Sequence, residues 1–326
     1  MIGAAVYLLA TLGCALATNI EEMIFLRFVQ AVGACSGVVI SSAVVRDRYD
    51  HQESARLFSI LLTIRGLGPI LAPIAGGAIV TFLGWRAIFW ALAAFGAMIA
   101  CVVTFGLKET RTAEVAARAR SESPLRAYRA ALSNPRIIGY MLTNGFNFGS
   151  MFAWVAAAPY LIIGTYHVPA LWFGWVFAIN AAGFMAASQI NHRLLRRFAA
   201  DQIMRWGAVG AAAAAAVLLL DALTGFGGFA GVMVPLFFSM SSLGLVSTNA
   251  MAGGLAVDPS RAGTVSALFG AAQFALGGSA TAIAAAFAST PAIGMASIIA
   301  VFAAGAVIFP LFGVKPAPKP ERYSLG

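Results

Sequence analysis

The sequence predicts an all-α membrane protein whose helices cross the bilayer about ten times. Two observations support this fold class. Sixty per cent of the 326 residues are apolar and only 10% are charged, whereas about 25% of residues are charged in soluble domains. In addition, apolar runs of about 20 residues recur along the chain, and each is long enough to cross a hydrocarbon core. Because lipid can solvate outward-facing apolar side chains, we expect membrane-spanning helices.

The expected spans form two groups, four before a polar and basic segment and six after it. In chain order they cover residues 1–18, 23–45, 57–80, 87–107, 136–163, 171–190, 202–221, 229–250, 263–287 and 292–313. All other connections are short. We therefore expect an N-terminal bundle at 1–107, a basic linker at 108–135, a six-helix bundle at 136–313 and a tail at 314–326.

Lys and Arg alternate between the connections, which indicates how the chain crosses the membrane. Cytoplasmic loops carry the excess of these residues. Every second connection and the tail contain Lys or Arg, whereas the others contain none except Arg86. We therefore expect both termini in the cytoplasm and a location in a bacterial-type inner membrane. The net charge of +9 then reflects membrane orientation, and no nucleic-acid partner is expected.

Several chemistries are not indicated. The sequence has no G-x-x-x-x-G-K-[ST] loop, no HExxH and no G-x-S-x-G, which argues against ATP hydrolysis by a P-loop and against the common hydrolase mechanisms. Cys14, Cys35 and Cys101 lie within apolar runs, which is typical of small packing residues. We expect neither an enzyme nor a metal site, and no bound cofactor.

Polar residues inside the N-terminal spans have two interpretations each. Arg27 and Gln30 are three residues apart and share a helix face. Arg27 either extends its charge to the outer membrane surface or faces an internal cavity, and Gln30 favours the cavity. Arg65, two turns inside the third span, is equally compatible with the cytoplasmic surface and with the cavity.

The third span also has an ordered pattern of glycine and proline. Two prolines at i and i+4 each remove a backbone donor, and the glycines permit bending and close helix packing. This pattern predicts a kinked helix that is packed tightly on a neighbour and serves as a hinge or seal. The residues are Gly68, Pro69, Ala72, Pro73, Gly76 and Gly77.

The first span of the C-terminal group has a polar and aromatic face. Asn144 and Asn147 share this face, and Trp154 continues it. Amides in membrane helices either bond neighbouring helices together or line a cavity. The same two interpretations apply to Asn180, Asn249 and Gln273 in later spans. The only carboxylate in the expected spans is Asp221, although proton relays usually need an acidic residue or histidine inside the membrane.

Several segments together resemble the Bcr/CflA (bicyclomycin/chloramphenicol resistance) family of the major facilitator superfamily. GPILAPIAGG at 68–77 is similar to the antiporter motif of the family's fifth helix. RFVQAVGA at 27–34 and VVRDRY at 44–49, which contains Arg46 and Asp47, resemble its fourth helix and the following loop. Three further matches are GWRAIFW at 84–90, the segment 173–198, and RAGTVSALFGAAQFALG at 261–277.

The resemblance implies proton-coupled export of amphipathic drugs or metabolites by alternating access, with the proton gradient as energy source. It assigns coupling or cavity lining to Arg27 and Gln30, and it assigns the seal to the glycine and proline residues of 68–77. The family has twelve helices, and the first span here is similar to its third. We therefore expect a four-plus-six arrangement that lacks counterparts of the first two helices and of their acidic residue, and the sequence leaves open whether this chain transports.

The expected partners are a small amphipathic substrate, protons and the lipid bilayer, and the family resemblance implies a monomer. Two alternatives remain open at this point. One is a symporter that takes up a metabolite, although the proline and glycine pattern argues against it. The other is a membrane scaffold or sensor that does not transport, although the sequence has no large soluble domain.

Overall fold

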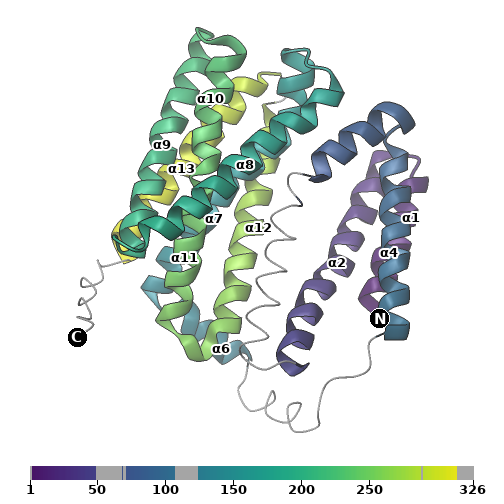
Figure 1. Ribbon diagram of the computed structural model, residues 1–326, viewed down its shortest axis with the longest axis horizontal. Coiled ribbons are helices and arrows are strands. Elements are labelled where there is room, and N and C mark those ends of the chain that lie inside the picture. Colours follow the sequence, from purple (N-terminus) through teal and green to yellow (C-terminus); the bar gives the residue numbers. More distant parts are fainter. Residues whose placement is uncertain (1, 49–67, 69–70, 107–123, 288, 314–326) are drawn as a thin grey trace. The chain divides into compact units, whose positions relative to one another are not determined.

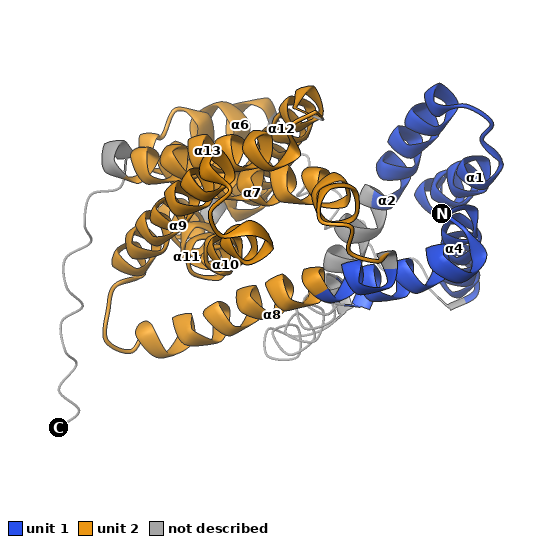
Figure 2. Cartoon of the chain, turned by 90° about the horizontal axis from the view of Figure 1, so that it is seen from above, with its two compact units in different colours: residues 1–121, 170–175 blue, residues 122–169, 176–326 orange. Residues whose placement is uncertain are grey.

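The computed structural model describes residues 2–48, 68, 71–106, 124–287 and 289–313. At 35–48 it describes the backbone alone. Within these ranges every regular element is a helix (Figure 1). The chain divides into two compact units (Figure 2). Unit 1 comprises Met1–Ser121 and Ala170–Trp175, and unit 2 comprises Glu122–Pro169 and Val176–Gly326.

Unit 1 contains α1 (Ile2–Leu16), α2 (Ile20–Arg48), the apolar helix Leu71–Leu83 and α4 (Arg86–Gly106). Helix α1 packs against both α2 and α4. The α1–α2 contact is close because Gly33 has no side chain. A Cβ atom at that position would lie 2.6 Å from the backbone nitrogen of Tyr7, so only glycine allows the two backbones to approach this closely.

The start of α2 is fixed by reciprocal hydrogen bonds. The side-chain oxygen of Asn19 accepts from the backbone N–H of Glu22 at 2.8 Å. The Glu22 carboxylate in turn accepts from the backbone N–H of Thr18 at 3.0 Å. The first bond satisfies a backbone donor that the first helical turn leaves without a partner, and the second ties the residue before Asn19 to that turn, so the sequence itself sets where α2 begins.

Unit 2 is built around α7 (Pro135–Ala158), which packs against α11, α12 and α13. A short helix, α6, precedes α7, and a π-helical segment continues it. The remaining bounds are α6 (Pro124–Leu132), the π-helix (Pro159–Thr165), α8 (Ala170–Leu194), α9 (Ala200–Thr224), α10 (Gly228–Ser241), α11 (Leu243–Val257), a 3-10 turn (Pro259–Arg261), α12 (Ala262–Ala286) and α13 (Pro291–Gly313).

Glycines on α7 bring its neighbours close. A Cβ at Gly145 would lie 2.7 Å from the Leu276 side chain of α12, and one at Gly149 would overlap the Phe302 ring of α13. The core beside these contacts contains fully buried side chains from several helices, including Ile137, Met204, Val246, Val265 and Phe269. Without a hydrophobic driving force between helices in lipid, such close van der Waals packing holds a membrane bundle together.

The predicted all-α membrane fold is confirmed. Among the described residues, seven helices are long and apolar enough to cross a bilayer, and Ile2–Leu16 and Leu71–Leu83 are shorter apolar helices. The expected span 229–250 differs in detail, because the structure divides it into α10 and α11 at Ser242. The Ser242 hydroxyl donates to the backbone oxygens of Ser239 and Phe238, and such bonds compete with regular helix geometry.

The basic linker expected at 108–135 is partly helical. Residues 107–123 lie outside the described part, but α6 occupies 124–132 and packs against α7 and α12. The division between the two units falls at Ser121 and Glu122, within the expected linker. Sequence reasoning missed α6 because a nine-residue helix is too short to be recognised as an apolar run.

Candidate functional site

In unit 1, Arg27 and Gln30 belong to a chain of hydrogen bonds that connects α2 to α1. The Arg27 guanidinium donates to Gln30 Oε1 at 2.7 Å, as their i+3 spacing predicts. The amide of Gln30 donates to the hydroxyl of Thr11 at 2.7 Å, and this hydroxyl donates to the Tyr7 carbonyl. Gln30 and Thr11 are buried, so these bonds satisfy polar groups inside the helix pair.

The Arg27 side chain itself is exposed. Its guanidinium carbon lies 5.6 Å from the centre of the Phe89 ring of α4, within the range of a cation–π interaction. The cation thus contacts an amide and an aromatic face at once, which holds it in place on α2.

The expected seal helix is described only in part. Arg65 and Pro69 lie outside the described residues, as do the side chains of Arg46 and Asp47 in the last turn of α2. Ala72, Pro73, Gly76 and Gly77 belong to the helix Leu71–Leu83.

The described residues show one close backbone contact of this helix. No described atom lies within 4 Å of a Cβ built at Gly68 or Gly76, so the packing expected at these two glycines stays a prediction. Gly174, in the part of α8 that belongs to unit 1, meets the backbone at Pro73 and Ile74. A Cβ at Gly174 would lie 2.7 Å from the Cα atom of Ile74.

In unit 2, α7 has a buried polar face that ends in an aromatic pair. Asn144, Asn147 and Ser150 are 1%, 3% and 3% exposed. Among the described residues, both polar atoms of the Asn144 side chain, Asn147 Nδ2 and Ser150 Oγ have no hydrogen-bond partner. Trp154 continues the same face and stacks on Phe177 of α8, with ring centres 5.1 Å apart.

These groups are suited to hold a polar ligand. A buried polar group without a partner costs about 1–3 kcal/mol, and a helix in a bilayer has no water to satisfy it. Together the side chains offer donors and acceptors beside an aromatic surface, and they carry no charge. This arrangement can bind an amphipathic molecule through hydrogen bonds at one end and stacking at the other.

The other expected amides differ in their surroundings. Asn249 on α11 donates to Asn191 Oδ1 of α8 at 2.7 Å, and both residues are buried, which favours the interpretation that Asn249 joins helices. Asn180 donates to the carbonyl of Val176 on its own helix, while its side-chain oxygen has no partner among the described residues. Gln273 is half-buried on α12, which packs against α7.

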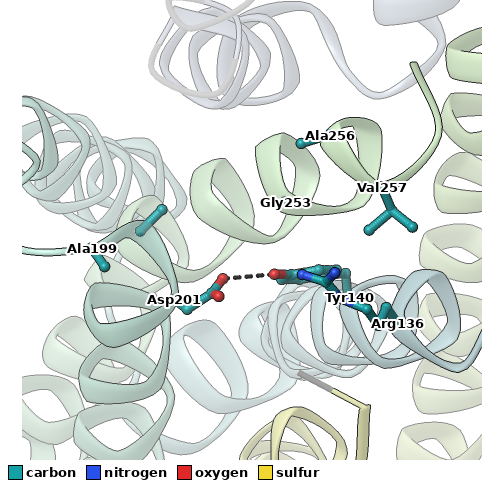
Figure 3. A pocket seen from close by; sticks show the side chains of 8 residues that line it. Arg136, Tyr140, Ala199, Asp201, Gly253, Ala256 and Val257 are labelled. Carbon is teal, nitrogen blue, oxygen red and sulfur yellow. Dashed lines mark hydrogen bonds between the residues drawn. The ribbon is translucent and has the colours of Figure 1, made fainter. Parts of the chain in front are cut away.

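Sequence reasoning missed a pocket at the end of unit 2 where α7 and α9 begin (Figure 3). Its volume is about 290 Å³. The Tyr140 hydroxyl donates to Asp201 Oδ1 at 2.7 Å, and Asp201 is only 8% exposed. The pocket is lined by Arg136 and Tyr140 of α7, Ala199, Ala200 and Asp201 at the start of α9, and Gly253, Ala256 and Val257 of α11.

Asp201 also corrects the expected distribution of acidic residues. Helix α9 begins at Ala200, two residues before the expected span, so Asp201 lies in its first turn. There the positive end of the helix dipole stabilises a carboxylate, which is why a buried acid is tolerated. No local signal could have linked it to Tyr140, which lies 61 positions earlier in the sequence.

Asp221, the carboxylate that was expected, lies at the opposite end of α9. Its Oδ1 accepts from the backbone N–H of Gly227 at 2.7 Å, so it anchors the α9–α10 connection. Tyr166 is the residue that follows the π-helix, and its hydroxyl donates to the Gly228 carbonyl at 3.3 Å. Burial, with a smaller effect of Asp221, raises the pKa of Tyr166, so this donor keeps its proton at neutral pH.

The described residues contain no group of three or more His, Cys, Asp or Glu that could hold a metal ion. What they do contain is a neutral polar face on α7, an Arg–Gln pair on α2 and a buried Tyr–Asp pair at one end of unit 2.

Comparison with known proteins identifies the family. Residues 1–282 match the family model of the Major Facilitator Superfamily. The chain belongs to this superfamily. Membership makes it a multi-pass membrane protein of a transporter superfamily and not an enzyme, and its relatives are bacterial. The helical architecture described above agrees with this assignment.

Among curated superfamily members, the chain is 32% identical over 252 residues to a bicyclomycin resistance protein homolog from Haemophilus influenzae, covering 77% of this chain and 63% of that protein. It is 28% identical to a chloramphenicol resistance protein from Pseudomonas aeruginosa, covering 85% of this chain and 64% of the relative. The resemblance to this resistance group is confirmed. The chain thus spans somewhat less than two thirds of the length of these two relatives.

Solved structures confirm the superfamily fold. A bacterial homolog of the human lysosomal transporter Spinster, in an inward-facing and unoccupied conformation, superimposes with a TM-score of 0.70 at 16% identity, covering 95% of this chain and 80% of that one. The xylose transporter XylE from E. coli superimposes with a TM-score of 0.67 at 14% identity, covering 96% and 80%.

Proposed function

We propose that the protein exports small amphipathic compounds across the inner membrane in exchange for protons, by alternating access. The observation that supports this best is the α7 face, where both polar side-chain atoms of Asn144, Asn147 Nδ2 and Ser150 Oγ are buried without described partners next to the Trp154–Phe177 stack. Neutral amides and aromatic rings accommodate many amphipathic molecules. The names of the relatives, which concern resistance to bicyclomycin and chloramphenicol, point to the same substrate class.

The proposal extends to energy source and partners. A proton gradient drives exchange, no cofactor is required, and the protein acts as a monomer in the bilayer. Because the two resistance relatives are covered to only 63% and 64% of their length, the activity is proposed for the whole protein. Arg27 and Gln30 contribute to coupling, and the helix Leu71–Leu83 with its preceding residues contributes the seal.

The distribution of charge supports an orientation for unit 2. The Tyr140–Asp201 pair and α6 mark one end of this unit, and Tyr166 and Gly228 mark the other. All Lys and Arg residues between 124 and 313 lie at or near the first end, and they are Arg126, Arg129, Arg136, Arg193, Arg196, Arg197, Arg205 and Arg261. Because cytoplasmic loops carry this excess, we propose that the first end and both termini face the cytoplasm.

Transport by inside-out membrane vesicles tests the proposal. Vesicles that contain the protein are energised by respiration, and uptake of a fluorescent amphipathic cation such as ethidium is followed. We expect accumulation that collapses when the proton gradient is dissipated. Accumulation only in vesicles that carry the opposite proton gradient would indicate an uptake symporter instead. No movement of the compound with either gradient would contradict transport by this chain.

Two variants separate substrate binding from helix packing. Asn144→Ala removes a side chain that has no described partner, so we expect unchanged or higher stability and an apparent substrate affinity about two- to tenfold weaker, the equivalent of one hydrogen bond. Asn249→Ala breaks the bond to Asn191, so we expect a loss of about 0.6 kcal/mol in stability, the average for such bonds in membranes. Equal stability losses and unchanged affinity in both variants would contradict the assignment of Asn144.

A further inference from the structure

The short helix α6 has three distinct faces. Ala127 and Ala131 are 7% and 1% exposed and face the bundle, where Ala131 joins the core cluster around Ile137. On another side, Leu125 and Leu132 are 78% and 47% exposed. Of these apolar side chains, only the two alanines are buried against the bundle. The two larger leucine side chains are exposed.

The exposed apolar residues form a single face. Leu125, Tyr128 and Leu132 are spaced at i, i+3 and i+7, which places them on one side of a helix. Tyr128 is 38% exposed. Arg126 and Arg129 are both exposed and lie about 100° and about 40° from Leu125 around a helix of 3.6 residues per turn. Helix α6 contains no acidic residue, so its outer surface is apolar with a positively charged edge.

The position of α6 along the chain places it beside the bilayer. It ends at Leu132, and the membrane-spanning helix α7 begins at Pro135. Three residues reach at most about 11 Å even when fully extended, and here the chain is tighter because the Asn134 N–H donates to the Ala131 carbonyl at 3.2 Å. The end of α6 therefore lies within the headgroup region that borders the hydrocarbon core.

We propose that α6 is an interfacial helix that binds the surface of anionic phospholipids. Leu125, Tyr128 and Leu132 enter the boundary between headgroups and acyl chains, and Arg126 and Arg129 contact the phosphate groups. An apolar face flanked by arginine, with no acid to repel phosphate, is the composition that lies in the plane of a membrane interface. This role is additional to the transport proposed above and does not depend on it.

The depth of individual positions in a membrane tests the proposal. The three native cysteines are replaced by alanine, and a nitroxide is attached to Leu125→Cys or, as a matched control, to Ala130→Cys. Ala130 is exposed on the opposite side of the same helix. The full chain is reconstituted in vesicles of phosphatidylcholine alone or of phosphatidylcholine mixed equally with phosphatidylglycerol. Accessibility to oxygen, which concentrates in lipid, is compared with accessibility to a water-soluble nickel chelate.

We expect the label at 125 to be accessible to oxygen and shielded from nickel, and the label at 130 to show the reverse. A second label at Leu132→Cys should behave like that at 125. The anionic lipid should increase the oxygen preference at 125. Since each basic residue near an anionic surface contributes the equivalent of about a fivefold change in binding, Arg126→Gln with Arg129→Gln should abolish this increase.

Other results overturn the proposal. Nickel access at 125 equal to that at 130 would mean that α6 stands in water. Shielding of 125 from both reagents would mean that another segment of protein covers the apolar face. If phosphatidylglycerol changed nothing at 125, or if the double glutamine variant responded to it like the unmodified chain, the arginines would have no role in lipid binding.

Discussion

Tyr140 and Asn144 lie one helical turn apart on α7, and their polar groups have opposite surroundings. The Tyr140 hydroxyl meets the Asp201 carboxylate, whereas the Asn144 amide is buried with no described partner. Burying an ionised carboxylate is tolerated only when it is hydrogen-bonded, so the first pair contributes to stability. An amide without a partner reduces stability, which is the expected condition of a group kept for binding a ligand.

Replacing Tyr140 by phenylalanine tests the first of these roles. The variant keeps the ring and removes the only part of the side chain that donates to Asp201. A hydrogen bond to a charged group contributes about 1.5–3 kcal/mol, and we expect the free energy of unfolding to fall by that amount. The measurement is denaturant unfolding of the protein in detergent, followed by circular dichroism.

Tyr128→Phe provides the matched control for this prediction, because Tyr128 is 38% exposed and surface substitutions usually change stability by less than about 0.5 kcal/mol. Asp201→Asn should give an intermediate loss, since the amide oxygen still accepts from Tyr140. If both phenylalanine variants lost the same stability, the bond between Tyr140 and Asp201 would have no structural role.

At the scale of helices, the positions of the spans could be predicted from apolar runs, whereas the contacts between helices could not. The run at 136–163 predicted α7 and its π-helical continuation, because apolar length alone identifies a span. The pairing of Asn249 with Asn191, or of Tyr140 with Asp201, depends on which faces meet, and every span here is apolar on most sides. Helix α6 was missed for a different reason, because its nine residues are too few to be recognised as an apolar run.

Glycine substitutions test the packing of these helices. Gly149 on α7 faces the ring of Phe302, and an added Cβ would overlap it. We expect Gly149→Ala to reduce the free energy of unfolding by about 1–3 kcal/mol, the usual effect of overpacking a core. The measurement is the same denaturant titration followed by circular dichroism, and the unfolding transition should occur at lower denaturant concentration.

Gly270→Ala on α12 serves as the control for the packing prediction, because no atom of the described residues lies within 4 Å of a Cβ built there. Alanine in a helix interior is favoured over glycine by about 0.5–1 kcal/mol, so this variant should be more stable than the original protein. A destabilisation of equal size at both positions would mean that the α7–α13 contact is not as close as described.

For the whole molecule, the distribution of Lys and Arg is the basis of the orientation proposed above. The sequence predicted alternating basic connections, and the structure brings the basic connections of unit 2 to the end where Tyr140 and Asp201 meet. The other end is marked by the bond between Tyr166 and Gly228. Sequence reasoning could predict this polarity because Lys and Arg can be counted along the chain. It could not predict which side chains join the helices at each end.

Labelling from one side of the membrane tests this orientation. Phe226, 96% exposed in the α9–α10 connection, and Arg196, exposed in the α8–α9 connection, are each replaced by cysteine in a chain whose three native cysteines are alanine. Because Arg-rich connections remain in the cytoplasm, a membrane-impermeant maleimide added to cells with a permeabilised outer membrane should label position 226 and not position 196. Both should react once the inner membrane is disrupted. The reverse pattern would place the basic end outside, and equal labelling before disruption would mean that the chain inserts in both orientations.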